Sequence, residues 1–152
     1  MIPVFTHLQK QGVPFVVIGG HAVNFHGFIR ATEDFDILFL RTDESEKRLH
    51  DALLQINACW IGNQINPETG IEKEFPVSAD FIRSNHLMML VTSMGYLDIF
   101  DFVPGFPQTP VEELMNTACT LDDVRIVNLE WLKKIKSASG RPRDQYDLEN
   151  LP

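Results

Sequence analysis

The sequence predicts one domain over residues 1–152 that mixes helices and strands. Its 152 residues can build one hydrophobic core, since domains usually span about 100–200 residues. Segments with helical and strand-like patterns alternate along the chain, and no linker rich in Pro, Gly or Ser divides them. Hydrophobic residues make up 44% and charged residues 22% of the chain, as in an ordinary globular protein. Disorder and low-complexity architecture are therefore excluded.

The N-terminal part is expected to alternate helices and strands, because its apolar residues switch between helical and strand-like spacing. The expected elements are a helix over about 2–11, a strand over 15–18, a short helix over 21–27, a strand over 34–40 and a helix over about 43–57. Gly12 and Gly27 end the first two helices. Asp43 and Glu46 have the spacing of a capping box, and an apolar stripe over 49–56 follows them.

The C-terminal part is expected to hold two hairpins and three helices. Residues 58–82 carry scattered Gly, Asn, Pro and Glu, which predicts loops with room for one short strand. The expected elements are a hairpin of 86–92 and 96–103 around Ser93-Met94-Gly95, a helix opening at Thr109-Pro110-Val111-Glu112, a hairpin over 119–127 turning at Asp122-Asp123, a helix over 129–139 closed by Gly140, and a short helix over 143–151.

Composition also limits the partners and the compartment. No apolar run approaches the ~18 residues that span a bilayer, and the N-terminus does not resemble a signal peptide, so a cytoplasmic protein without a membrane partner is expected. Cys59 and Cys119 suit no disulfide framework or zinc motif and are expected in the core. Thirteen basic against 21 acidic residues give a net charge of −8. This charge argues against broad nucleic-acid binding and leaves room for a local basic site.

A pair of glycines stands shortly before a pair of acids. Gly19-Gly20 follows the strand over 15–18, and thirteen residues separate it from Asp34. Because side chains alternate along a strand, Asp34 and Asp36 project from the same face, about 6–7 Å apart. Two carboxylates this close repel each other unless a cation lies between them, and such hard oxygen ligands suit Mg²⁺ or Mn²⁺.

The glycine pair supplies the opposite polarity. Backbone N–H groups at the start of a helix attract anions, and glycine allows a phosphate to approach the backbone. A metal-binding pair of acids facing an anion-binding turn is the arrangement that phosphoryl or nucleotidyl transfer requires.

The pattern resembles the nucleotidyltransferase fold of the DNA polymerase β superfamily, in the form found in minimal nucleotidyltransferases and abortive-infection-type toxins. The resemblance covers about residues 13–151, apart from 58–82. The matching segments are Gly19-Gly20 with Asp34 and Asp36, Arg30-Ala31-Thr32, Leu97-Asp98-Ile99-Phe100 with Val103-Pro104-Gly105, and the tail from Leu132 through Gly140-Arg141-Pro142-Arg143-Asp144 to Leu148. The chain departs from the pattern at His21, since active members often carry a serine in the glycine turn.

The resemblance implies an α+β fold with a mixed β-sheet flanked by helices. It also implies transfer of a nucleoside monophosphate from an NTP to an acceptor hydroxyl, with release of pyrophosphate. Asp34, Asp36 and Asp98 would be the catalytic carboxylates and would hold Mg²⁺ or Mn²⁺. The nucleotide-binding residues would be Gly19, Gly20, His21, Arg30, Thr32 and Lys136. The acceptor is left open among RNA, a protein and a small molecule. A partner protein and a toxin–antitoxin-like role rest on the resemblance alone.

Several candidate residues have a structural interpretation as well. Asp34 and Asp36 could line the solvent face of an edge strand, Gly19-Gly20 could be a simple tight turn, and Arg30 could pair with Glu33. Lys136 shares the apolar stripe of its helix, so it must reach a ligand or pair with Asp144 or Asp147. Asp101 is the other candidate for the third acid, expected on the opposite face of the strand from Asp98, where a structural or solvated carboxylate is favoured.

The function has alternatives too. One is a catalytically inactive nucleotidyltransferase-fold module that binds a nucleotide, RNA or a partner protein. Another is a structural domain stabilised by Ca²⁺ or Mg²⁺. Residues 133–143 hold five basic and no acidic residues, and this patch suits either a triphosphate or a solvated helix end.

Overall fold

The computed structural model describes residues 2–152, which form one eight-stranded sheet and seven helices. The helices are α1 (Pro3–Lys10), α2 (Gly19–Phe25), α3 (Asp43–Gln55), α4 (Ala79–Ser84), α5 (Val111–Asn116), α6 (Leu129–Ser139) and α7 (Pro142–Asn150). The strands are β1 (Phe15–Ile18), β2 (Asp34–Phe39), β3 (Cys59–Ile65), β4 (Glu72–Pro76), β5 (Leu87–Thr92), β6 (Gly95–Phe100), β7 (Cys119–Leu121) and β8 (Val124–Ile126). The predicted α+β fold with a mixed sheet is confirmed.

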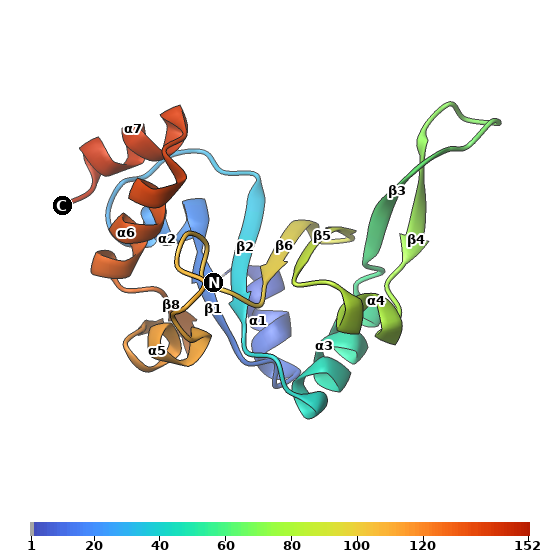
Figure 1. Ribbon diagram of the computed structural model, residues 1–152, viewed down its shortest axis with the longest axis horizontal. Coiled ribbons are helices and arrows are strands. Elements are labelled where there is room, and N and C mark those ends of the chain that lie inside the picture. The colour runs from blue at the N-terminus through green and yellow to red at the C-terminus, as the bar shows by residue number, and fades with distance from the viewer. Residues whose placement is uncertain (1) are drawn as a thin grey trace.

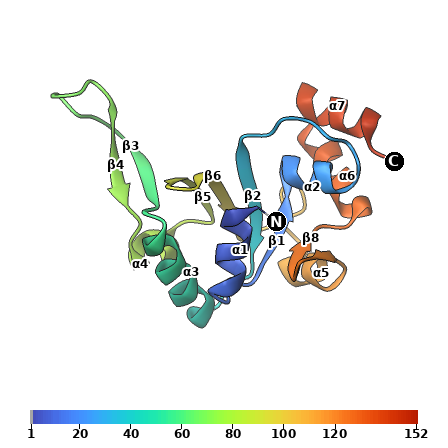
Figure 2. The same ribbon diagram turned by 180° about the vertical axis from the view of Figure 1, so that it is seen from behind.

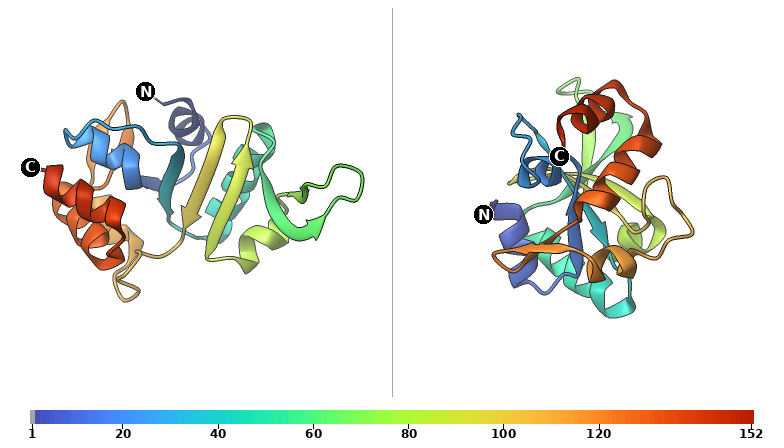
Figure 3. Two further views of the ribbon diagram at one scale, coloured as in Figure 1. Left: turned by 90° about the horizontal axis from the view of Figure 1, so that it is seen from above. Right: turned by 90° about the vertical axis from the view of Figure 1, so that its left-hand side faces the viewer.

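The sheet has the strand order β4-β3-β5-β6-β2-β1-β8-β7. Strand β2 runs parallel to β6, and β1 runs parallel to β8, while the other neighbours are antiparallel. Figure 3 shows β2 and β6 side by side in the middle of the sheet. Parallel neighbours need a long crossover, and here it runs from α3 through β3, β4, α4 and β5. The crossover therefore returns the chain to the strand that carries the predicted acid pair.

The two faces of β2 have different environments. Phe35, Ile37 and Phe39 point to the face covered by α1 and α3, where the Phe5 ring of α1 meets that of Phe35 edge-on at 5.6 Å. Figure 2 shows α1 and α3 in front of this face. Asp34 and Asp36 point to the other face, where they line one cleft together with residues of α6 and α7. These two helices lie together at one end of the molecule (Figure 1). The apolar face thus holds the strand in place, while the opposite face is open to polar groups at Asp34 and Asp36 and is closed at Leu38, which is fully buried.

Most of the expected elements are present, with differences at several helix starts. Helix α2 spans Gly19–Phe25 rather than 21–27, so the glycine pair opens the helix instead of preceding it. Helix α3 is capped by the reciprocal hydrogen bonds of Thr42 and Ser45, so the expected capping box of Asp43 and Glu46 is wrong. Helix α5 begins at Val111 after Pro110, without a side-chain cap. Hydroxyl and carboxylate caps have similar preferences, which explains the one-residue error at α3.

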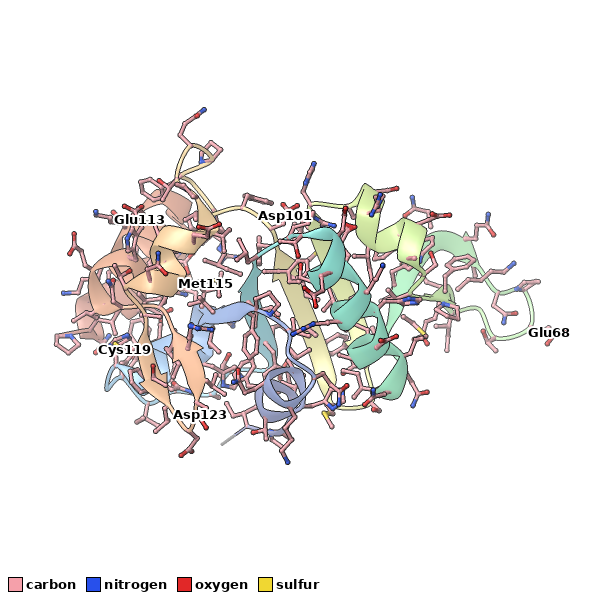
Figure 4. All side chains as sticks on the ribbon, turned by 90° about the horizontal axis from the view of Figure 1, so that it is seen from below. Glu68, Asp101, Glu113, Met115, Cys119 and Asp123 are labelled. Atoms are coloured by element: carbon pink, nitrogen blue, oxygen red, sulfur yellow. The ribbon has the colours of Figure 1, made fainter. Side chains whose placement is uncertain are left out.

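Residues 58–82 contradict the expectation of loops with one short strand. They form the antiparallel strands β3 and β4 and the helix α4, and Trp60 stacks on the rings of Phe75 and Phe81. The hairpin projects away from α6 and α7, and Figure 4 shows Glu68 at its tip. Its outer half is exposed on both faces, so the sequence carries little of the alternation that marks a half-buried strand.

The two cysteines are half-buried and free, so the expectation that both lie in the core is wrong. Cys59 lies on β3 and Cys119 on β7, both away from the centre of the sheet. None of the helices in residues 2–152 has the length and apolar character needed to cross a membrane.

Arg41, just after β2, connects four segments of the fold. Its guanidinium donates to the carboxylates of Asp101 and Glu46, each at 2.8 Å, and to the backbone carbonyls of Ile82 and Asn85, each at 2.7 Å. Asp101 also contacts Nδ1 of His86 at 2.8 Å. Strand β6 ends at Phe100, so Asp101 lies beyond the strand rather than on its opposite face as expected. The structural role expected for Asp101 is confirmed.

We predict that Arg41→Gln lowers the free energy of unfolding by about 2 kcal/mol, because hydrogen bonds to charged groups contribute about 1.5–3 kcal/mol and the partners lose their donor. Arg48→Gln is the control, since Arg48 makes an exposed i,i+4 pair with Glu44 that contributes about 0.3–0.5 kcal/mol. Urea denaturation measures both changes. Equal losses in the two variants would contradict the role assigned to Arg41.

Candidate active site

A cleft of about 730 Å³ lies between the open face of the sheet and the C-terminal helices. Its sheet side is lined by Gly19, Gly20, Thr32, Asp34 and Asp36. Its helical side is lined by Lys136, Ser139, Arg141, Arg143 and Asp144, with apolar side chains between the two sides. The cleft therefore places carboxylates opposite cationic groups.

Asp36 and Asp98 face each other on neighbouring strands. The parallel register of β2 and β6 pairs Asp36 with Asp98 and Asp34 with Tyr96. The carboxyl groups of Asp36 and Asp98 are close enough for one to donate a hydrogen bond to the other when protonated. Both residues are half-buried, whereas Asp34 is exposed at the start of β2. The structure thus brings Asp98, and not Asp101, to the predicted acid pair, although Asp98 itself is not among the residues that line the cleft.

Crowding changes the acidity of this group. Burial, the charge and hydrogen bond of Asp98 and the charge of Asp34 raise the pKa of Asp36 to about 7, with Lys136 acting in the opposite direction. Burial and the charge of Asp34 also raise the pKa of Asp98. The folded chain alone therefore disfavours full ionisation of the three acids. A divalent cation would remove that penalty.

The donor chemistry of the three acids fits Mg²⁺ or Mn²⁺, which prefer carboxylate oxygens. Within residues 2–152, however, no three His, Cys, Asp or Glu side chains already surround a common point as ligands. Asp34, Asp36 and Asp98 would have to turn toward such a point. The proximity of Asp36 to Asp98 and the exposure of Asp34 leave room for that rearrangement.

The glycine pair fits closely against the acid strand. Gly19 has φ +70°, and a Cβ at this position would overlap with Oδ2 of Asp36. A Cβ on Gly20 would overlap with Oγ1 of Thr32 and would lie 3.2 Å from Nη1 of Arg30. Side chains at both positions would therefore displace residues of the cleft. The turn must be glycine because the backbone approaches Asp36 and Thr32 so closely.

The two predicted cations are held in ion pairs. Arg30 donates to both carboxylate oxygens of Asp147, at 2.6 and 2.8 Å, so the alternative pairing with Glu33 is wrong. Lys136 contacts Asp144 at 2.9 Å and Asp147 at 3.0 Å, as its structural interpretation expected. Helix α6 buries Lys136 because this residue lies on the stripe that carries Leu132. The positive charge of Lys136 also acts across the cleft, because it opposes the rise in the pKa of Asp36.

Arg141, Arg143 and Ser139 are cleft residues that the sequence did not single out as site residues. Arg141 pairs with Asp144 at 2.8 Å, and Arg143 has no ion-pair partner in the described part of the chain. The signal was present in the basic stretch 133–143. Its other lysines lie outside the cleft: Lys134 contacts Glu130 and the Trp131 ring, and Lys133 contacts the carbonyl of Pro152.

His21 does not reach the cleft as expected. Its ring stacks on Phe35 at 4.8 Å and meets Phe5 edge-on at 5.7 Å, on the opposite face of the sheet from Asp36. Its Nε2 is buried and has no hydrogen-bond partner within residues 2–152. Burial, and to a lesser extent the charge of Arg30, lowers the pKa of His21. The His21 side chain therefore does not contribute a phosphate contact to the cleft in this structure.

No protein-family model matches the chain, and no curated protein matches it. Solved structures with similar folds include an antigenic nucleotidyltransferase-like protein from Paracoccidioides brasiliensis, with 19% identity and a TM-score of 0.55. That alignment covers 97% of this chain and 69% of the other. The likeness shows a nucleotidyltransferase-like fold.

Two Helicobacter pylori structures are also similar, each at 16% identity. JHP933 has a TM-score of 0.48 over 96% of this chain and 62% of the other. A protein provisionally assigned as a nucleotidyltransferase has a TM-score of 0.47 over 95% of this chain and 63% of the other. The chain thus spans less than two thirds of either protein.

We predict that the metal-free protein loses stability as pH rises from about 4 to about 7. The folded state keeps a proton on Asp36 that the unfolded chain releases near its ordinary pKa of 3.8, so stability falls until the folded pKa of about 7 is passed. The total change is at most about 4 kcal/mol, since one pKa unit corresponds to about 1.4 kcal/mol. Asp36→Asn should reduce this slope and melt above wild type at pH 8 in EDTA. A wild-type slope in Asp36→Asn would contradict the assignment.

Gly19→Ala should destabilise the protein more than Gly70→Ala. Both glycines have φ near +70°, so both substitutions add about 1 kcal/mol of backbone strain. Only Gly19 has Asp36 in the way, and such overlap costs about 1–3 kcal/mol more. Thermal melts of the two variants isolate this difference. Identical melting temperatures would show that the turn does not press on Asp36.

Proposed function

We propose that this chain is a metal-dependent nucleotidyltransferase, which moves a nucleoside monophosphate from an NTP to an acceptor hydroxyl and releases pyrophosphate. The observation that carries the proposal is the pairing of Asp36 with Asp98 across parallel strands, beside Asp34 and against the Gly19 backbone. The nucleotidyltransferase-like fold supports it. The cationic wall of the same cleft supports a polyanionic substrate.

Asp34, Asp36 and Asp98 would hold Mg²⁺ or Mn²⁺, which would neutralise the triphosphate and activate the acceptor when bound. Asp98 would orient the acceptor hydroxyl and accept its proton. The oxygen of the acceptor forms a bond to the α-phosphorus, and the bond from that phosphorus to the bridging oxygen of the β-phosphate breaks. The electron pair of that bond leaves with pyrophosphate.

The chain's remaining part in the reaction is to position the triphosphate. Gly19 and Gly20 bring their backbone to the cleft beside Asp36, and Thr32 adds a hydroxyl there. Arg143 offers a cation without an ion-pair partner in residues 2–152, and Lys136 and Arg30 offer charges that Asp144 and Asp147 partly compensate. Fixed charges at a partly enclosed site stabilise a transition state that spreads negative charge over phosphate oxygens.

The acceptor could be a hydroxyl of RNA, of a protein or of a small molecule, and a partner protein could present it. A toxin-like role follows only from the sequence resemblance. A second candidate function is a binding module without turnover. The ion pairs that occupy Arg30 and Lys136, and the turning of His21 away from the cleft, favour that candidate.

The first test combines binding with transfer. We expect one or more of ATP, GTP, CTP and UTP, together with Mg²⁺, to raise the melting temperature by several degrees, because a ligand at about 100 times its Kd stabilises the folded state by about 2.7 kcal/mol. Label from an α-³²P NTP should then appear in RNA, in a protein or in a small hydroxyl compound. Asp36→Asn should lose both the Mg²⁺-dependent shift and the transfer.

Asp51→Asn is the matched control, since Asp51 is an exposed carboxylate on α3 outside the cleft. It should behave as wild type. A metal-dependent shift without any transfer would select the binding module. No shift with any nucleotide would overturn the nucleotidyltransferase and leave a module that binds RNA or a partner protein.

A further inference from the structure

Three donors in the helical wall of the cleft converge on one carboxylate, Asp144. Its Oδ1 accepts from the ammonium group of Lys136 at 2.9 Å. Its Oδ2 accepts from Nε of Arg141 at 2.8 Å and also from the hydroxyl of Ser139. Although burial acts in the opposite direction, the hydrogen bonds lower the pKa of Asp144 to about 2. The side chain is 2% exposed, yet the residue lines the cleft.

This donor set is suited to a phosphate group as well as to a carboxylate. Guanidinium and ammonium groups bind both anions with similar distances, because both present oxygens that share a negative charge. A hydroxyl donates to either. Arg143 lines the same wall and has no ion-pair partner in residues 2–152, so a larger anion would find more cationic contacts than Asp144 uses.

Asp147 lies one turn further along α7 than Asp144 and, unlike Asp144, does not line the cleft. It also holds Lys136, at 3.0 Å, and it accepts both donors of Arg30. Its side chain is fully buried. Lys136 therefore remains anchored from below if Asp144 moves away. Asp147 thus anchors Lys136 inside the protein, and Asp144 pairs with the same ammonium group at the wall of the cleft.

The geometry points to a phosphate subsite formed by Lys136, Ser139 and Arg141, in which Asp144 takes the place of a phosphate group until a polyphosphate displaces it. This inference rests on the proposed function, and it assigns the donors that one phosphate of the NTP would use. Because the entering anion must replace three charge-assisted contacts, the subsite selects anions that carry several charges. A ligand with little negative charge therefore does not displace Asp144 from these donors.

Tripolyphosphate in EDTA tests the subsite without metal or turnover. Asp144→Asn keeps the shape of the side chain and removes its charge, so tripolyphosphate should bind roughly tenfold more tightly than to wild type, as expected from the loss of a competing charged hydrogen-bond partner. Isothermal titration calorimetry on the full chain measures the Kd. Inorganic phosphate should also gain affinity in this variant.

Asp147→Asn is the matched control, because it makes the same charge change beside the same lysine. If the removed carboxylate acted only by long-range electrostatic repulsion, the affinity for tripolyphosphate would rise similarly in both variants. Competition for the subsite would tighten it mainly in Asp144→Asn. Equal tightening in both variants, no tightening in Asp144→Asn, or no binding to any variant would overturn the inference.

Wild-type protein provides a second measurement should Asp144→Asn fail to fold. Saturating tripolyphosphate should shift the side-chain Nε–H resonance of Arg141, which leaves Asp144, and not that of Arg30, which stays on Asp147. An unmoved Arg141 resonance with bound tripolyphosphate would refute the displacement. Anion binding of the expected kind without nucleotide transfer would refute the proposed enzyme activity alone.

Discussion

The carboxyl groups of Asp36 and Asp98 are brought together by backbone pairing, before any ligand is considered. The parallel register of β2 and β6 places the two residues directly opposite each other, and the apolar side chains on the other face of β2 hold that strand against α1. The register cannot slip by one residue without turning Phe35 and Ile37 outward. The core therefore fixes an electrostatically unfavourable pair. The absence of a side chain at Gly19 is a direct consequence, because the turn must pass beside Asp36.

The opposite wall of the cleft balances this charge in a different way. Lys136 and Arg141 of this wall are held in place by the buried carboxylates of Asp144 and Asp147 on α7, whereas Arg143 has no ion-pair partner in residues 2–152. Each buried acid has at least two charged partners, as a charge removed from water requires. The sheet side of the cleft therefore carries crowded carboxylates, and the helical side carries cations that are mostly paired with acids. On the proposed function, such a division suits a substrate that is a complex of a polyanion and a divalent metal.

The sequence predicted those parts of the fold that depend on local patterns. Helix α6 and its end at Gly140 follow from an apolar stripe and a residue that tolerates positive φ, and Asp122-Asp123 marks the β7–β8 turn for the same conformational reason. The hairpin of β3 and β4 was not predicted beyond one short strand. These strands are held by pairing with each other and are little buried, so they lack the alternation of apolar residues that marks a half-buried strand. The closeness of Asp36 to Asp98 agreed with the family pattern. The direction of His21 and the partners of Arg30 depend on residues far along the chain, and no local pattern carries that information.

The long separation of these partners also determines when the site can exist. Asp98 lies on β6, beyond the crossover through β3, β4 and β5, and Arg30 meets Asp147 across 117 residues of sequence. Closing loops of this length slows folding, and pairings between distant segments form after local ones. A nascent chain that has folded only α1, β1 and β2 carries Asp34 and Asp36 without the third acid or the cationic wall. Assembly of the cleft thus requires the chain as far as α7, and a chain that ends before α7 would present the acids without the groups that balance them.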